Sequence, residues 1–491
     1  MNSMTLKNLL LVTLFLPLLG QAQGLKSLAP SNLSGIYGTL ANPANAVGGI
    51  DRYSFNLVGV SVRANTNALR TDLEYDLLRI VGRRPIRLEQ GSLEHASVKT
   101  PRKVVLKPLV YAELDALQLA AQIAITKKVG IYAFARERSV ANFDKGDYQS
   151  LKYLVEGKYD HKDPLVKLGF DIRSLAYQEL GVGGAIQLYE KRQHYLKMGF
   201  TYKRINARGV YGVNVPHFES RLEDSTIKVT AELNIIETAL DIATQNPLDF
   251  LLNPALGRGN AMDIGFVYEH RPRSLKSTYR KNNLKNKNKV FNSRNLTKYD
   301  YRIGLSLNDF GRVRFNRDVV TSQTNRINAS FKPHDFANMT AEDYSQQIMD
   351  SSINYSSSDE LSFQLPTTVV VFYDQRLLNK WYISATYRQN ITAKSLGSFY
   401  TPTDLHVQFR KETAHCVFGF PVHVVPATRT FTLGAYAQAG PFFMGTDNVG
   451  TLFLKKMYNP SFYTGLFYNI RYKADATIEN HRSFKTKRRR V

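Results

Sequence analysis

The residues of this 491-residue chain that could do chemistry are few and scattered. Cys416 is its single cysteine, which excludes a disulfide framework and a thiolate metal cluster. His415 precedes it, but neighbours on a strand point to opposite faces, so the pair cannot share a metal ion. The ten histidines are dispersed along the sequence. We therefore expect neither a metal site nor a cofactor.

The sequence also lacks the motifs of common enzymes. It contains no Gly-x-Ser-x-Gly, no His-Glu-x-x-His and no phosphate-binding loop. The glycines of Gly181-Val-Gly-Gly184 lie inside an alternating apolar segment, which favours a strand over a nucleotide site. A membrane-facing Ser and His pair, as some barrel enzymes use, is an alternative that one sequence leaves open. Our expectation is that the protein is not an enzyme.

The net charge of +24 raises the question of an anionic partner. Basic and aromatic residues interleave in Tyr195–Lys203, as on a platform for single-stranded nucleic acid. Strand alternation explains the same pattern, with Lys and Thr on one face and apolar residues on the other. Most basic residues fall in expected loops. We expect outer-membrane lipid and lipopolysaccharide as partners, and no nucleic acid.

The element that recurs is an alternating strand, best seen at 299–307. Its odd-numbered residues are apolar or aromatic, and its even-numbered residues are polar or small. Side chains alternate faces along a strand, so one face is apolar throughout. Asn308-Asp-Phe-Gly311 supplies turn residues, which predicts a hairpin between strands 299–307 and 310–317. The outward row expected here consists of Tyr299, Tyr301, Ile303, Leu305 and Leu307.

About 14 to 16 such segments follow one another without a fixed period, which favours a barrel over a propeller or sandwich. Two regions depart from the pattern. Residues 140–178 predict a long loop or broken strands, and 234–256 a short helical insertion. In the segment 117–125 we expect Leu117, Leu119, Ala121, Ile123 and Ile125 to face outward. The residues expected to face the lumen are Gln118, Gln122, Arg302, Arg388, Asn469 and Arg471.

The two ends of the chain predict separate segments. Residues 1–22 have a basic start, an apolar run and a small-residue cleavage site, as a secretory signal peptide does. Residues 23–50 are small, turn-rich and without helical or strand period. Residues 473–491 form a basic tail. No later stretch has about 18 uninterrupted apolar residues, the length of a transmembrane helix.

Asn42-Pro43-Ala44-Asn45, running into Asp51–Leu57, resembles the start of FadL/PorV-like outer-membrane barrels. Further similar stretches are Met262–Tyr268, Tyr301–Leu305 with Asn308–Gly311, Leu365–Thr367 and Gly440–Asn448. The chain is especially similar to a Gram-negative barrel family of unknown function, found alone or ahead of an OmpA-like domain. The resemblance implies periplasmic termini and an N-terminal segment inside the lumen. For FadL relatives it implies passage of hydrophobic molecules, and for PorV relatives handling of secretion cargo.

The fold class predicted is therefore all-β, a single transmembrane antiparallel barrel of about 14 strands over residues 51–472. Residues 23–50 would plug its lumen, with Asn42, Pro43, Ala44 and Asn45 as plug or gating residues. The expected function is an outer-membrane barrel that passes hydrophobic small molecules. The alternatives are a PorV-like scaffold for secretion components or surface attachment, and a soluble β-rich protein that binds polyanions in the envelope.

Overall fold

A computed structural model gives the fold of most of the chain between residues 25 and 471. The predicted signal peptide and basic tail lie outside the described residues. The residues described are 25–72, 96–98, 107–146, 148, 165–191, 193–223, 226–238, 255–271, 299–315, 320–331, 352–357, 361–377, 380–395, 397–413, 415–450, 456–457 and 459–471.

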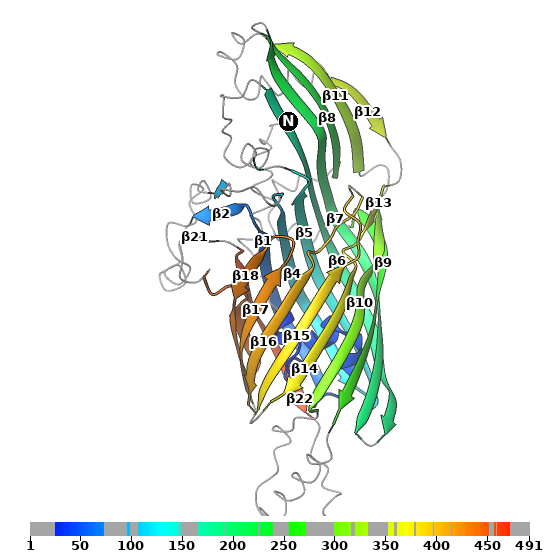
Figure 1. The fold of residues 1–491 in the computed structure, drawn as a ribbon. Coiled ribbons are helices and arrows are strands. Elements are labelled where there is room, and N and C mark those ends of the chain that lie inside the picture. The colour runs from blue at the N-terminus through cyan, green and yellow to red at the C-terminus, as the bar shows by residue number, and fades with distance from the viewer. Residues whose placement is uncertain are drawn as a thin grey trace, which may run out of the picture.

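In this described part of the chain, fourteen antiparallel strands close into a barrel (Figure 1), which confirms the predicted fold class. β18 and β19 count as one strand interrupted at Gly434, and β13 extends the line of β14. Around the wall the order is β1 (Asp51–Thr66), β4 (Val110–Ala124), β5 (Val129–Asp144), β6 (Leu165–Lys191), β7 (His194–Glu223), β9 (Gly257–His270), β10 (Tyr301–Phe315), β13 (Leu361–Gln364) with β14 (Thr368–Arg376), β15 (Trp381–Asn390), β16 (Asp404–Glu412), β17 (Cys416–Val425), β18 (Thr430–Leu433) with β19 (Ala435–Ala439), β20 (Phe442–Thr446) and β22 (Ser461–Arg471). β22 pairs with β1 from Asp51↔Arg471 to Arg63↔Ser461, which closes the ring.

Beyond one end of the barrel a blade of strands continues the sheet (Figure 1). β6 and β7, of 27 and 30 residues, are long enough to belong to the wall and to the blade. The first part of β7 pairs with β9, and its last part with β8 (Thr226–Thr238). β11 (Val320–Phe331) and β12 (Ser352–Ser357) add to β8. A second small sheet contains β2 (Leu69–Asp72), β3 (Ala96–Val98) and β21 (Lys456–Met457).

The two faces of the wall differ as strand alternation requires. Ile303 and Leu305 are 44% and 49% exposed on the outside, while Arg302 and Ser306, which flank them, are buried inside. The same holds at Phe418 and Phe420 of β17, both about half exposed. A closed ring with an apolar outer surface satisfies its backbone hydrogen bonds without a free edge, as a bilayer demands. It excludes the alternative of two stacked soluble sheets.

A β-bulge corrects one part of the predicted pattern in β4. Its pairing with β5 slips between Leu117 and Leu119, so the side-chain alternation changes phase at Gln118. Leu119 is exposed on the outside, but Leu117 is completely buried inside the barrel. The prediction that Leu117 faces outward is therefore wrong. Gln122, beyond the bulge, lies in the interior as predicted.

The predicted hairpin at residues 308–311 is also wrong. β10 runs without a break from Tyr301 to Phe315, and its pairing with β9 slips between Leu307 and Phe310. Asp309 adopts a left-handed φ of 58°, so the turn-like residues form a bulge within one strand. Tyr299 precedes the strand and is buried, so it does not belong to the outward row.

Two irregular regions contain strand. β5 continues to Asp144 and β6 begins at Leu165, so of the two alternatives predicted for residues 140–178 the described part fits the broken strands and not a continuous loop. β8 continues to Thr238, so the predicted helical insertion is wrong for residues 234–238, and 239–254 lie outside the described residues. In the first region, charged residues pair across strands with partners that are distant in sequence. A local pattern does not show such pairs, so the strand signal there is weak.

The two ends of the barrel are unlike. One end carries mostly short connections, such as those after Ala124 and Lys191, the longer one between His270 and Tyr301, and both barrel termini, Asp51 and Arg471. We call it the short-turn end, and the opposite one the long-loop end. The blade rises from the long-loop end (Figure 1). Within the described residues, no helix has the length and apolar character needed to cross a bilayer.

Candidate functional site

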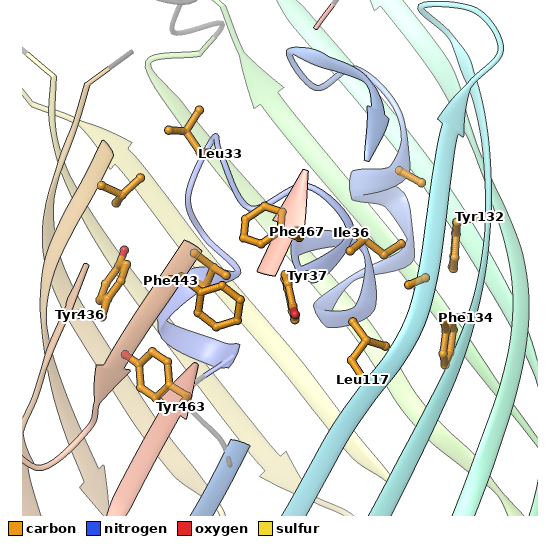
Figure 2. Packing of buried hydrophobic residues seen from close by; sticks show 14 of the residues in the cluster. Leu33, Ile36, Tyr37, Leu117, Tyr132, Phe134, Tyr436, Phe443, Tyr463 and Phe467 are labelled. Atoms are coloured by element: carbon orange, nitrogen blue, oxygen red, sulfur yellow. The ribbon is translucent and has the colours of Figure 1, made fainter. Parts of the chain in front are cut away.

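Residues 25–50, the N-terminal segment, lie inside the barrel near its short-turn end (Figure 1). They form α2 (Leu25–Leu28), α3 (Ile36–Ala41) and the 3-10 helix η1 (Pro43–Ala46). The sequence shows no helical period here because each helix is at most six residues long. Ile36 and Tyr37 are buried among inward-facing wall residues, and Tyr37 meets Phe443 and Phe467 edge-on at 5.1 and 5.2 Å (Figure 2).

Hydrogen bonds join this segment to strands around the ring. The Tyr37 hydroxyl donates to Asn56 Oδ1 at 2.5 Å, and Thr39 donates to Gln122 Oε1 at 2.6 Å. On another side, both the backbone N–H and the side-chain amide of Asn32 donate to Glu412, at 3.0 and 2.8 Å. Asn469 donates to the Leu33 carbonyl at 3.0 Å. The segment is therefore fixed to β1, β4, β16 and β22 together.

The predicted gating residues Asn42, Pro43, Ala44 and Asn45 meet a third side of the wall. The Asn42 carboxamide accepts a hydrogen bond from Ala44 N–H and caps η1. The same side chain donates to the carbonyls of Phe266 and Leu305, at 3.3 and 3.1 Å. Asn45 instead donates back to the Gly38 carbonyl at 2.9 Å. Asn42 thus joins helix capping to wall contact.

Glycines in the wall let this part of the segment approach the sheet. A Cβ atom added at Gly199 would lie 2.3 Å from the carbonyl carbon of Pro43. One added at Gly265 would lie 2.2 Å from Asn42 Oδ1. No real Cβ atom is found so close, so both positions require glycine as long as the segment stays in place.

Beyond the segment, the inward side chains form a layer of ion pairs centred on Asp309. Arg138 donates to Asp309 at 2.7 Å and to Glu113 and Glu179 at 3.0 Å. Lys203 contacts Asp309 at 2.5 Å and Asp263 at 2.8 Å. The bulge places the Asp309 carboxylate in the lumen, where it neutralises two cations from β5 and β7.

A second group of charges lies on the neighbouring part of the wall, formed by β10, β14 and β16. The Arg410 guanidinium holds Asp374 at 2.8 and 2.9 Å and Glu412 at 2.8 Å. Arg302 donates to Asp374 at 3.1 Å and also to the carbonyl of Pro30 in the N-terminal segment. Tyr299 donates its hydroxyl to Asp374. This group links the wall charges to the segment.

Asp404 organises a third group, with Arg388 at 2.7 Å, His423 at 3.1 Å and Arg63 at 3.2 Å. Beside it, His406 Nε2 lies 3.0 Å from Ser27 Oγ. This contact brings a serine and a histidine together inside the lumen. The Ser27 hydroxyl, however, donates to Asp447 at 2.8 Å, so it accepts from His406 and does not pass its proton to it.

Towards the long-loop end a connection folds into the lumen. Residues 391–403 between β15 and β16, described except for Leu396, reach β4, β5 and β6 across the ring; we call them the crossing loop. Arg173 of β6 donates to the carbonyls of Ser395 and Ser398. Asn142 of β5 donates to the Tyr400 carbonyl at 3.0 Å. Ser398, Phe399, Tyr400 and Thr401 are all buried.

Arg173 is itself buried and holds the crossing loop through an ion-pair network. Its guanidinium donates to Asp144 at 2.8 Å and lies 3.2 Å from Asp171. Phe399 packs against Phe363, with ring centroids 6.0 Å apart, in a cluster of apolar side chains that fills this level of the lumen. The lumen is therefore occupied at two levels, by the N-terminal segment and by the crossing loop.

A cavity of 140 Å³ lies between the N-terminal segment and the ion-pair layer. Its apolar side is made by Leu40 and Ala41 of the segment with Val370 and Phe372 of β14. Its polar side carries residues from all three charged groups, namely Glu113, Asp115, Arg136, Arg138, Lys203, Arg302, Asn308, Asp309, Arg388, Asp404 and His406. An amphipathic cavity of this kind can hold a small molecule with both an apolar and a polar part.

The lumen residues named from sequence are brought to different places. Arg302 and Arg388 line the cavity, whereas Gln122 and Asn469 bind the N-terminal segment. Arg471 lies near Asp51 where the barrel closes, and Gln118 is half-buried at the bulge. Asp309, Arg173 and the crossing loop were missed. The sequence Asn308-Asp-Phe-Gly311 does show that Asp309 could adopt a left-handed conformation. Its ion-pair partners, however, depend on how the strands are aligned, which the sequence does not show.

A closed antiparallel ring with an apolar outer face and a polar, occupied lumen defines a transmembrane β-barrel. Within that class, residues 56–447 match the family of unknown function DUF5723, and the chain belongs to this family. A comparison with curated protein sequences finds no match. In the part of the chain that the structure describes, no group of three His, Cys, Asp or Glu side chains could hold a metal ion.

The chain is also similar to solved barrels of the FadL type. The toluene transporter TodX of P. putida shares 8% identity over 89% of this chain and 95% of that one, with a TM-score of 0.40. The toluene transporter TbuX of Ralstonia pickettii shares 11% over 89% and 94%, with a TM-score of 0.35. A FadL homologue of Pseudomonas aeruginosa shares 9% over 89% and 94%, with a TM-score of 0.21. These values do not transfer an activity.

Proposed function

We propose that the protein is a gated, non-enzymatic barrel of a Gram-negative outer membrane that passes small molecules with an apolar part. One observation supports this proposal: the lumen is occupied at two levels, and an amphipathic cavity lies between the N-terminal segment and the ion-pair layer. A barrel whose lumen is filled only to stabilise the fold would need neither a second occupied level nor a cavity. Export by the predicted signal peptide, and contact of the outer face with lipid and lipopolysaccharide, belong to the same proposal.

In this scheme the N-terminal segment and the crossing loop are the two gates. The bonds that hold them are hydrogen bonds and ion pairs, which can exchange for water when a gate moves, each at a net cost of about 1 kcal/mol. The apolar contacts of Tyr37 and Phe399 exclude water while the gates are closed. Asn42, Pro43, Ala44 and Asn45 act here as the part of the gate next to the wall.

Deletion of residues 31–50 tests the role of the first gate. The expected result is faster entry of a hydrophobic fluorescent probe into cells that produce the variant, at equal amounts of barrel in the outer membrane. Heat-dependent mobility on gels verifies that the variant still forms a barrel. The matched variant is Asn42→Ala, which keeps the segment but removes its contact with the wall. It should also speed probe entry, by less than the deletion does. Unchanged entry in both would contradict the proposal.

The blade favours a second candidate function, a scaffold for secretion components or surface attachment. β7, β8, β11 and β12 extend the sheet well beyond the barrel, and a conduit does not need such an extension (Figure 1). The experiments above separate the two functions. Normal probe entry together with lost export of surface proteins, after deletion of residues 31–50, would favour the scaffold.

A further inference from the structure

Five polar atoms at the cavity between the N-terminal segment and the ion-pair layer have no hydrogen-bond partner among the described residues. They are Asn45 Oδ1, Asn308 Oδ1, Arg138 Nε, Arg388 Nε and His406 Nδ1, and all five residues line the cavity. Arg138 and His406 are themselves only 5% and 2% exposed. Buried polar atoms are normally paired, so unpaired ones on residues that line a cavity indicate which groups a bound molecule would present to them.

The chemistry of these atoms specifies both donors and acceptors. The two guanidinium Nε–H groups can only donate, and the two amide oxygens can only accept. His406 joins the acceptors when its ring is neutral, because its Nε2–H donates to Ser27 Oγ, whose own hydroxyl proton goes to Asp447. A hydroxyl or an amide group, which donates and accepts at once, satisfies both kinds.

The charges around the cavity argue against an ionic ligand. Each of the five cationic side chains that line it already has a carboxylate at 2.5–3.1 Å. The pairs are Arg136–Asp115, Arg138–Asp309, Lys203–Asp309, Arg302–Asp374 and Arg388–Asp404. A bound anion or cation would have to break one of these pairs or stay without a counter-charge in a buried place. A neutral molecule avoids both costs.

Size and the apolar side complete the description. A cavity of about 150 Å³ holds one benzene ring, and this one measures 140 Å³. Leu40, Val370 and Phe372 offer a surface for such a ring or a short alkyl chain. We infer that the cavity is a binding site for a small neutral molecule of this size that bears a hydroxyl or amide group. This deepens the proposed function by naming the class of molecule that is held on the way.

Binding to the purified full-length barrel in detergent tests the inference with three probes of one carbon skeleton. Benzyl alcohol carries the hydroxyl, toluene has no polar group and benzoate is charged. Equilibrium dialysis should show benzyl alcohol binding about tenfold more tightly than either, as expected when two or more hydrogen bonds form in a buried site. Toluene or benzoate binding as tightly as benzyl alcohol would overturn the inference.

A matched pair of variants separates the cavity from the detergent micelle. Val370→Phe fills the cavity, while Val371→Phe places the same ring on the lipid-facing side of the next position. Only the first should abolish benzyl alcohol binding. Equal binding by both would place the probe in the micelle or elsewhere and refute the site.

Asn308→Leu tests the polar reading independently of folding. It removes an unpaired acceptor but also a bond to the Ala41 carbonyl, so benzyl alcohol affinity alone is insufficient. The readout is the ratio of benzyl alcohol to toluene affinity, which should fall several-fold; a merely structural role would leave the ratio unchanged and count against us. Unchanged probe entry after deletion of residues 31–50, together with benzyl alcohol binding to the wild-type barrel, would instead contradict the proposed function and leave this site standing.

Discussion

The N-terminal segment and the crossing loop both occupy the lumen, yet they are held in different ways. The segment is held by many separate bonds, from Asn32, Tyr37, Thr39 and Asn42 to strands all around the ring. The crossing loop is bonded to Asn142 and to the backbone of Gln364, and at its centre the buried Arg173 donates to two of its carbonyls. The contacts of the segment are thus distributed around the ring, whereas those of the loop include a concentrated group around one buried charge.

This difference has a thermodynamic meaning. A distributed closure loses about 1 kcal/mol for each bond removed, so no single substitution should release it completely. A concentrated closure depends on a buried charge, whose removal leaves carboxylates without a partner and costs several times more. The crossing loop should therefore respond sharply to one change, and the segment gradually to several.

The largest effect is expected for Arg173→Ala. The change removes both bonds to the crossing loop and leaves Asp144 and Asp171 buried without their arginine, a loss of about 3 kcal/mol or roughly a hundredfold in the open fraction. Conductance in planar bilayers measures the open fraction. Arg173→Lys keeps the charge but not the planar fork of donors, so its open fraction should lie between those of wild type and Arg173→Ala. Arg221→Ala, at an exposed site on β7, is the matched control and should behave as wild type.

The second-largest effect is expected for Gly199→Ala. This change displaces the backbone of the N-terminal segment, whereas other single substitutions remove only individual hydrogen bonds. The added methyl group would overlap the Pro43 carbonyl, and the segment must shift at a cost of about 1–3 kcal/mol. A maleimide that cannot cross the membrane should then label Ala44→Cys faster, in a Cys416→Ser background. Gly184→Ala, whose Cβ would lie 3.4 Å from its nearest neighbour, should not alter labelling. Equal labelling rates in both would show that the close approach does not hold the segment.

Asn42→Ala should have a smaller effect. It removes the cap on η1 and two bonds to wall carbonyls, together about 1–2 kcal/mol. The same labelling assay should show roughly a tenfold change. Asn45→Ala loses only the bond to Gly38 and should change labelling less. A larger change in labelling for Asn45→Ala than for Asn42→Ala would contradict the hydrogen bonds described for these two residues.

Tyr37→Phe should have the smallest effect at neutral pH, about 1 kcal/mol for one hydrogen bond. Burial, with Asp115 adding to it and Arg136 opposing it, raises the pKa of Tyr37 well above its ordinary value of 10.0. The folded protein then keeps a proton that the unfolded chain loses above pH 10, so this contribution is complete below pH 10 and declines above it. Unfolding midpoints between pH 8 and 12 should fall less steeply for Tyr37→Phe than for wild type; parallel curves would contradict this.

Local alternation was sufficient to predict the barrel, because a strand shows its lipid-facing row in its own sequence. Ile303 and Leu305 of β10 face outward as expected. Leu117 and Tyr299 do not, since a bulge or a strand end changes the phase of alternation without a local hydrophobic signal. A pattern of period two cannot reveal where the period slips.

The site was less accessible to sequence reasoning. Asp309 and Arg138 are 171 positions apart, and their pairing follows from the register of β5 and β10 relative to the lumen. Arg173 lies in a stretch where charges and tyrosines obscure the strand pattern. The gating residues Asn42, Pro43, Ala44 and Asn45 came from a family resemblance, and which of them meets the wall became clear only from the glycines opposite.

One strand connects the two extremes of the molecule. β7 begins at His194, passes Gly199 beside Pro43, and continues to Glu223 at the tip of the blade. Thirty residues of extended chain reach up to about 100 Å, several times the thickness of the hydrocarbon core. A hydrogen-bonded ribbon of this length is stiff along its axis. A mechanical load on the far tip would therefore act on the backbone that contacts the innermost part of the barrel, without a hinge of separate domains in between.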